Sequence, residues 1–340
     1  MTPQTPRRIL VVRMGRVGDM VMITPALRLL LDGFPDAELH LLTTTEGQRV
    51  LRGFHPRLTR MHLYHRRLPG TWLLRPRLVR ELRRENYDRA YVFESHPHYR
   101  ELVAEVAPAI HELANPAGSA HYSARCLDVV DPTLARPSPH GWVTLPVTEA
   151  GRVAAATYLS EHGLHEGDWL VGLHLTFSET SRGPFGSGRG RKHREWPVAA
   201  GAELAMRLHA YGRSQGVAIR PVLDVLPQER RMAAAFGERV GEAVTVMCGP
   251  PDFERYKAVL QRLRLLVAPN TGPMHVAAAV DTPVVALFSG WSPEDCGPFV
   301  PPERAVTLRA EDTPQPELGL SAISAEAAFE ACRPFLPGCV

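Results

Sequence analysis

Short apolar runs alternate with helical segments through the first third of the chain. Residues 8–13 form a compact apolar run, and the runs at 38–43, 59–63 and 90–94 predict three further buried strands. Between the first two runs, apolar residues recur at helical spacing, at Ile23, Ala26, Leu27 and Leu30. Thr24-Pro25 either caps this helix or marks a kink in a helix that begins near Asp19. Regular alternation of strand and helix predicts a parallel sheet with right-handed crossovers.

The alternation decays between about Asn115 and Pro146, where Pro-rich breakers predict loops, a late edge strand and a linker. It then resumes, with strands expected at 170–175, 217–224, 243–247, 264–268 and 283–288, and helices at 150–162, 198–210, 228–237, 252–263 and 271–280. We therefore predict two doubly wound α/β domains, 1–148 and 149–320, that face each other across a cleft. A last helix in 321–340 could cross back to the first domain.

Composition narrows the class of protein. The net charge of +3 is too small to indicate nucleic-acid binding. No segment approaches the roughly 20 apolar residues of a spanning helix, so we expect a cytoplasmic protein. Five cysteines stand far apart without a C-x-x-C pair, which predicts neither a zinc site nor a disulfide framework. All basic residues except Lys192 and Lys257 are arginine, a bias that indicates a GC-rich genome before any function.

A glycine turn follows the first strand and closes on Gly18-Asp19. Glycines let the backbone approach a ligand closely, and a carboxylate at a helix start is favoured in its charged form. Asp19 is therefore a candidate to accept a proton from an attacking hydroxyl group. The alternative is that Asp19 only caps the helix, which Asp often does.

A second turn, Asn270-Thr271-Gly272, follows the buried run that ends near residue 268 and precedes an alanine-rich helix. The free N–H groups at such a helix start form an anion site, and the Thr271 hydroxyl adds a donor. The sequence thus predicts a phosphate-binding site here. Ordinary capping, with His275 packed inside the helix, is the alternative.

Taken together, these two segments resemble glycosyltransferase family 9, the heptosyltransferases of lipopolysaccharide inner-core assembly. The family opens with a strand, a loop closing on Gly-Asp and a helix with Leu-Pro-Ala-Leu; here Gly18-Asp19 precedes Thr24-Pro25-Ala26-Leu27. The family's later motif, Asp-(Ser/Thr)-Gly-Pro-Met-His, reads Asn270-Thr271-Gly272-Pro273-Met274-His275. The resemblance implies a GT-B fold of two Rossmann-like domains. It also implies an inverting, metal-independent transferase, without a cofactor, that takes a sugar from an ADP-activated donor, and the chain has no D-x-D pair.

The resemblance implies roles for individual residues. Asp19 would be the general base, and Arg13, Arg16 and Gly18 would contact the acceptor. Arg194, two residues before Trp196-Pro197, stands where the family has a lysine that neutralises the leaving diphosphate, and Lys192 could replace it. Glu229 falls where the family places an acidic partner for the ribose. The full donor-binding set that we expect is Thr176, Lys192, Arg194, Glu229, Asn270, Thr271, Gly272, Pro273, Met274 and His275.

The segment 57–84 is rich in arginine, with aromatic and apolar residues interleaved. It predicts contact with an anionic acceptor or with an anionic membrane surface at the inner face of the cytoplasmic membrane; arginine-rich helix faces caused by genome bias are the alternative. The expected partners are thus a nucleotide-sugar donor and a glycolipid or small-molecule acceptor, without nucleic acid. A protein or natural-product acceptor, a GT-B sugar-nucleotide epimerase and a non-catalytic nucleotide-sugar-binding protein stay open as alternatives.

Overall fold

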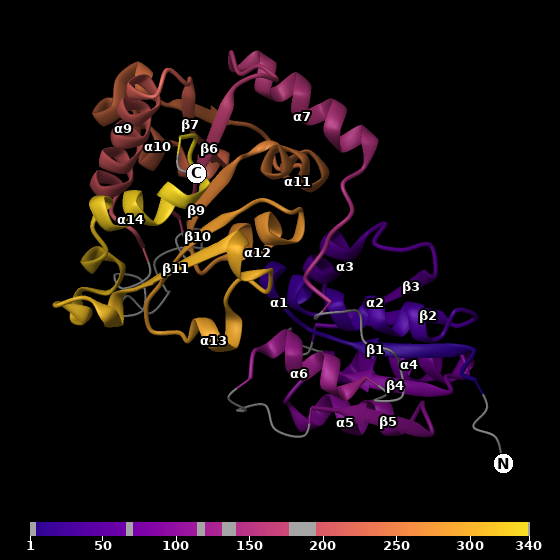
Figure 1. Cartoon of the computed structure of the whole chain (residues 1–340). Coiled ribbons are helices and arrows are strands. Elements are labelled where there is room, and N and C mark those ends of the chain that lie inside the picture. Colours follow the sequence, from indigo (N-terminus) through magenta and orange to yellow (C-terminus); the bar gives the residue numbers. More distant parts are fainter. Residues whose placement is uncertain (1–4, 66–70, 114–119, 131–140, 177–194, 339–340) are drawn as a thin grey trace. The chain divides into compact units, whose positions relative to one another are not determined.

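The computed structural model describes residues 5–65, 71–113, 120–130, 141–176 and 195–338 (Figure 1). The chain divides into two compact units, residues 1–146 and 147–340. Within the described ranges, no helix is both long and apolar enough to cross a lipid bilayer.

The first unit is built on a parallel sheet of five strands in the order β3-β2-β1-β4-β5. The strands are Arg8–Val12 (β1), Glu38–Thr43 (β2), Leu58–Leu63 (β3), Arg89–Val92 (β4) and Ala109–Glu112 (β5). Ile9 to Val12 in the central strand β1 are fully buried, because helices cover both faces of a parallel sheet. The four strands predicted at 8–13, 38–43, 59–63 and 90–94 are confirmed.

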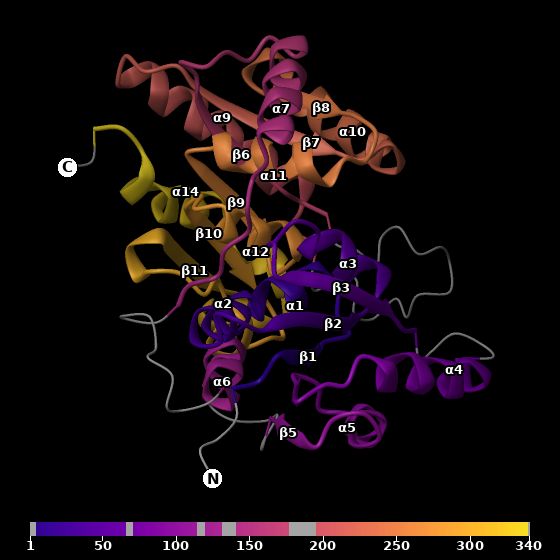
Figure 2. The same cartoon turned by 90° about the vertical axis from the view of Figure 1, so that its right-hand side faces the viewer.

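The helices of the first unit are Val17–Met22 (α1), Thr24–Gly33 (α2), Thr45–Leu51 (α3), Thr71–Arg84 (α4), Pro97–Ala104 (α5) and Tyr122–Val129 (α6). Leu78 and Leu82 of α4 and Leu102 of α5 belong to one buried apolar cluster with residues of β1 and β4, so both helices cover the same face of the sheet (Figure 2). Helix α2 packs against α6 instead. The sheet is therefore covered on both faces, as the doubly wound pattern predicts.

Helices α1 and α2 are separated at Ile23. Pro25 lies in the first turn of α2, where its missing N–H removes no helical hydrogen bond. The Thr24 hydroxyl does not cap α2; it donates to the Val21 carbonyl at 2.7 Å. Of the two interpretations of Thr24-Pro25, a break in a helical segment that starts before Asp19 is therefore the correct one.

The second unit contains a parallel sheet of six strands in the order β11-β10-β9-β6-β7-β8. The strands are Trp169–Leu173 (β6), Ile219–Val225 (β7), Thr245–Cys248 (β8), Leu265–Pro269 (β9), Val284–Phe288 (β10) and Ala305–Arg309 (β11). The helices are Glu149–Glu161 (α7), Val198–Ser214 (α9), Arg230–Val240 (α10), Phe253–Arg262 (α11), Gly272–Ala279 (α12), Pro293–Cys296 (α13) and Ala325–Cys332 (α14). This strand order is that of the Rossmann fold.

The C-terminal helix α14 belongs to the core of the second unit. Ala325, Ala328 and Cys332 pack in the same apolar cluster as Leu204 and Leu208 of α9. The segment 321–340, which the sequence sets apart from the second domain, is therefore part of that unit.

Two edge strands differ from the expectation. Strand β5 ends at Glu112, before the segment where a late edge strand is expected, and β11 was not predicted. Both strands are half-buried and carry polar residues, so neither forms the continuous apolar run that identifies a strand buried on both faces.

Each sheet has one point where the strand order reverses. In the first sheet it lies between β1 and β4, and in the second it lies between β6 and β9. Ligands of open α/β sheets bind outside the carboxyl ends of the strands at such points. The segments that follow β1, β4, β6 and β9 are therefore where a site is expected.

Candidate active site

Asp19 is fixed beside the carboxyl end of β1. The loop after β1 leads into α1 at Val17, and Asp19 lies in the first turn of that helix. Its Oδ2 accepts a hydrogen bond from the Arg16 backbone N–H at 2.8 Å, and its Oδ1 accepts one from Arg13 Nη2 at 2.7 Å. The Asp19 side chain is still 36% exposed. The helix-start contact predicted by the capping alternative is present, and the carboxylate keeps lone pairs for a further proton donor.

Arg13 is buried between Asp19 and the loop after β4. Its Nη1 donates to the Phe93 carbonyl at 2.9 Å and lies 3.4 Å from Glu94 Oε1. The Tyr122 ring packs against the guanidinium, with its centroid 4.5 Å from Cζ. Burial disfavours the cation, but Tyr122, Asp19 and Glu94 together raise the pKa of Arg13 above its ordinary value. Arg13 is thus a fixed positive charge directed at Asp19.

The other two expected acceptor contacts lie close to Asp19. Arg16 is exposed at the start of α1, and Gly18 is half-buried inside the helix. The tightest glycine in this loop is Gly15, which the sequence did not single out. A Cβ atom added at Gly15 would lie 2.3 Å from the Asp19 Cβ. Gly15 is therefore the residue that leaves space for the Asp19 side chain.

The second group of predicted residues follows β6 and β9, which are neighbouring strands of the second sheet. Thr176 comes three residues after β6, and Asn270 and Thr271 follow β9 directly. Thr271 is the N-cap residue of α12 but makes no side-chain cap; its hydroxyl donates to the Pro269 carbonyl at 3.0 Å. The backbone N–H groups of the first turn, at Gly272 and Met274, are therefore the donors that α12 presents.

The six residues of this motif differ in exposure. Asn270, Thr271, Gly272 and Pro273 are half-buried, whereas Met274 and His275 are buried in the helix. The Asn270 side-chain amide donates to Cys296 Sγ at 3.4 Å. His275 is thus packed, as the alternative interpretation of this residue predicts, and the first four residues form the accessible part of the motif.

Glu229 follows β7, on the other side of β6. It is half-buried, and its Oε2 accepts a hydrogen bond from the Leu226 backbone N–H at 2.9 Å. His174, which follows β6, has its pKa lowered by burial, and Glu229 offsets part of this effect. Glu229 is therefore on the same sheet edge as Thr176, where donor contacts are expected.

Two expected phosphate ligands, Lys192 and Arg194, lie outside the described residues. The structure resumes at Glu195, and the next residue, Trp196, is buried. Trp196 Nε1 donates to the Ile323 carbonyl at 2.9 Å. The chain that follows the basic segment is thus anchored in the core of the second unit, directly before α9.

Sequence comparison identifies the type of enzyme. Residues 185–322 match the family model of glycosyltransferase family 9 (heptosyltransferase). The chain is therefore a glycosyltransferase, and residues 185–322 are similar to family 9. The glycosyltransferase is 26% identical over 329 residues to lipopolysaccharide heptosyltransferase 2 of Salmonella typhimurium, with 88% of each chain covered.

Solved structures support the same assignment of the fold. A family 9 glycosyltransferase from Veillonella parvula aligns with a TM-score of 0.79 at 20% identity, covering 97% of each chain. The E. coli ADP-heptose lipopolysaccharide heptosyltransferase II aligns with a TM-score of 0.72 at 20% identity, covering 96% of the glycosyltransferase and 98% of that chain. The predicted GT-B class, with two parallel α/β sheets, is confirmed.

The space at Gly15 leads to a first prediction for the glycosyltransferase. Gly15→Ala should lower turnover about 100-fold. The new methyl group would lie only 2.3 Å from the Asp19 Cβ, so the Asp19 side chain must move out of its place. Turnover and the melting temperature should be measured together. Gly237→Ala is the matched control, because nothing lies within 4 Å of its added Cβ atom; it should leave turnover unchanged. Equal turnover in both variants would contradict the prediction.

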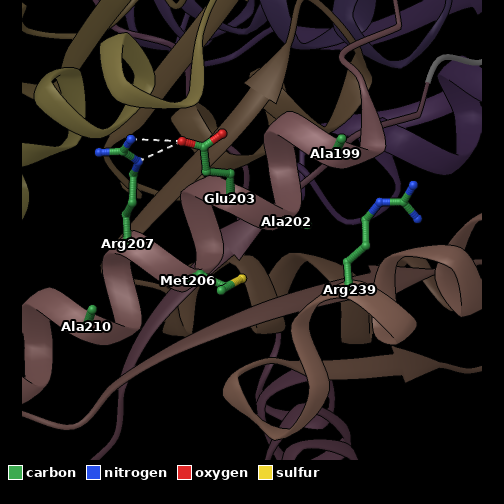
Figure 3. Close-up of a pocket in the computed structure, with 7 residues that line it drawn as sticks. All are labelled: Ala199, Ala202, Glu203, Met206, Arg207, Ala210 and Arg239. Atoms are coloured by element: carbon green, nitrogen blue, oxygen red, sulfur yellow. Dashed lines mark hydrogen bonds and ion pairs between the residues drawn. The ribbon is translucent and has the colours of Figure 1, made fainter.

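A groove on α9 does not belong to the candidate site. Ala199, Ala202, Met206 and Ala210 line it together with Glu203, Arg207 and Arg239, and its volume is about 480 Å³ (Figure 3). The one carboxylate in it, Glu203, forms an ion pair with Arg207 at 2.8 Å. The groove lies on helices rather than at the carboxyl ends of strands, where open α/β sheets bind their ligands.

Among the described residues, His40, His62 and Glu85 form a group that could hold a metal ion. The Tyr87 hydroxyl lies between the two imidazoles, 2.9 Å from His40 Nδ1 and 3.0 Å from His62 Nε2. Burial lowers the pKa of His40, which favours its neutral form. The Tyr87 hydroxyl therefore satisfies one nitrogen of each imidazole, and Glu85 pairs with Arg60, so we interpret the cluster as a polar contact under α4.

Proposed function

We propose that the glycosyltransferase moves a heptose, or a related sugar, from an ADP-activated donor to a hydroxyl group of an acceptor, with inversion and without a metal ion. The names of its relatives support heptose as the sugar, and an E. coli heptosyltransferase of similar fold was solved with ADP. The observation on which the mechanism depends is the position of Asp19: a fixed and partly exposed carboxylate at the point where the first sheet reverses its strand order.

In this mechanism Asp19 is the general base. It accepts the proton of the acceptor hydroxyl while the hydroxyl oxygen forms a bond to the anomeric carbon of the donor. The bond between that carbon and the diphosphate oxygen breaks on the opposite face, and ADP leaves with both bonding electrons. An ionised carboxylate is a weak base, but it suffices because the hydroxyl proton becomes more acidic as the new bond forms.

The second unit would bind the donor. The diphosphate would accept hydrogen bonds from the first-turn N–H groups of α12 at Gly272 and Met274, with Asn270 and Thr271 beside it. Lys192 or Arg194 would neutralise the leaving diphosphate. Glu229 would hold the ribose hydroxyls, and Thr176 lies at the same strand ends. On the acceptor side, Arg16 and Gly18 would contact the acceptor beside Asp19. Arg13 is buried and would hold the Asp19 carboxylate through its hydrogen bond.

The test of this proposal is acceptor-dependent release of nucleotide. Purified protein is mixed with ADP-heptose, UDP-sugars or GDP-sugars, with and without lipopolysaccharide core, glycoprotein or small-molecule acceptors. We expect ADP release that requires both ADP-heptose and one acceptor class. Release from UDP-sugars alone would redirect the donor assignment. Sugar isomerisation without acceptor would indicate an epimerase, and donor binding without turnover would indicate a binding protein.

We also propose that α4 brings the enzyme to an anionic membrane on the cytoplasmic side. Leu73 and Leu74 are 61% and 58% exposed at its start, and Arg77, Arg80 and Arg84 are exposed along it. Exposed leucines beside arginines can insert between acidic lipid headgroups. This arrangement favours a lipid-linked acceptor over a soluble one.

Replacing both leucines gives a second prediction. Leu73→Ser/Leu74→Ser should reduce binding to vesicles containing phosphatidylglycerol by about tenfold. Serine lacks the free energy that each exposed leucine gains when it moves from water into the bilayer. Sedimentation with vesicles measures this. Val153→Ser is the control because Val153 is 60% exposed on α7 in the second unit. Unchanged sedimentation of the double variant would exclude α4 as the docking element.

A further inference from the structure

Glu94 is connected to the proposed base through Arg13. It comes two residues after β4, and Arg13 comes directly after β1, the neighbouring strand. The Phe93 backbone N–H donates to the Val12 carbonyl at 3.0 Å, which fixes the two strand ends against each other. Glu94 Oε1 then accepts the Met14 backbone N–H at 2.6 Å and lies 3.4 Å from Arg13 Nη1. Its side chain is only 13% exposed.

We propose that Glu94 is a positioning residue for sugar transfer. Glu94 fixes the Arg13 guanidinium and the loop after β1, and Arg13 in turn fixes the Asp19 carboxylate. This inference rests on the proposed function, because it needs Asp19 as the base. Glu94 does not touch the reacting atoms in this role. It acts on the two groups that do fix Asp19, namely the Arg13 guanidinium and the backbone of the loop.

The contacts of Arg13 explain why Glu94 controls it. One nitrogen, Nη2, is directed at Asp19, while Nη1 is held by the Phe93 carbonyl and by Glu94. The Tyr122 ring covers the face of the guanidinium. A guanidinium held by its other nitrogen and by a ring cannot rotate away from Asp19, so the direction of the carboxylate is set in advance.

The charges make a second, separable contribution. Arg13 lies between two carboxylates, so the group of three carries one net negative charge. If Glu94 is made neutral, the positive charge of Arg13 acts on Asp19 alone and favours its ionised, weakly basic form. If Arg13 is removed, two nearby carboxylates face each other, and one of them tends to keep a proton. The two changes therefore act on the proposed base in opposite directions.

The experiment measures kcat/KM as a function of pH in three variants. It compares the acid limb, the pH range over which kcat/KM falls as the pH is lowered. Glu94→Gln keeps an acceptor for the Met14 N–H but loses the charge; we expect kcat to fall about tenfold, KM for the donor to change less than about twofold, and the limb to move to lower pH. Arg13→Met should move the acid limb to higher pH. Glu94→Asp, which keeps the charge, should lower kcat but leave the limb near its wild-type position.

Glu105→Gln is the matched control. Glu105 is a carboxylate of the same unit that pairs with Arg75 and Arg83 at the surface, and its loss should change neither kcat nor the limb. An unchanged limb and kcat in Glu94→Gln, or shifts in the same direction for Glu94→Gln and Arg13→Met, would overturn the proposal. A Glu94→Gln variant as inactive as Asp19→Asn would also overturn it, since Glu94 would then be the base. Full turnover in Asp19→Asn would instead remove the proposed function itself.

Discussion

Asp19→Asn should reduce acceptor-dependent ADP release by about 10²–10⁴-fold, the range that a positioned general base contributes. The amide keeps the size of the carboxylate and can still accept the Arg16 backbone N–H, but it cannot take a proton from the acceptor hydroxyl. Donor binding should change little, because the proposed donor contacts lie in the second unit. Turnover and ADP affinity should be measured on the same preparation.

The control for this variant is Asp88→Asn. Asp88 also receives backbone hydrogen bonds, from the N–H groups of Arg7 and Arg8 at 2.7 and 2.9 Å, at the opposite end of β1. Its replacement should cost some stability and leave turnover unchanged. Comparable loss of turnover in both variants would mean that Asp19 acts only through the fold. Wild-type turnover in Asp19→Asn would exclude it as the base.

The fold could be predicted from the sequence because its central strands are buried on both faces. Such strands consist of continuous apolar residues, as in Ile9 to Val12 of β1, and turn signals mark their ends. The edge strands β5 and β11 lack this signal. Each has a neighbour on one side only, so polar residues such as His111 and Glu112 are tolerated in β5.

The local part of the site was also accessible from the sequence. The Gly18-Asp19 turn and the Asn270-Thr271 turn both follow an apolar run directly, which is where a doubly wound sheet places ligands. The contact between Arg13 and Glu94 could not be predicted from the sequence, because 81 residues separate the two. It depends on the parallel pairing of β1 with β4, which the sequence does not specify. The charge of Glu94, two residues after the buried strand β4, was the one available signal.

Asp224 is a polar residue that interrupts the apolar run of β7. Tyr158 donates a hydrogen bond to its Oδ1 at 3.0 Å. Burial raises the pKa of Asp224 to about 6, although Tyr158, Arg255 and His162 act in the opposite direction. The carboxylate also lines a small internal cavity of about 20 Å³, beside His174. The fold therefore favours the protonated form of this side chain.

Asp224→Asn should therefore stabilise the protein above pH 7 and have little effect near pH 4. Because the pKa of Asp224 is raised on folding, its favourable contribution is complete below its ordinary pKa of 3.8 and is lost as pH rises through about 6. A shift from 3.8 to about 6 corresponds to at most about 3 kcal/mol. Asparagine can accept the Tyr158 hydrogen bond without carrying a charge, so it avoids this loss.

Melting temperatures of both proteins at several pH values between 4 and 8 measure the effect. The gap between Asp224→Asn and the wild type should open between about pH 4 and 7 and then stay constant, because Asp224 is ionised in both states above that range. Asp312→Asn, which replaces an exposed carboxylate of the same unit, should show no such pH-dependent gap. A gap of the opposite sign would show that the negative charge of Asp224 stabilises the fold, with the nearby Arg255 outweighing the cost of burial.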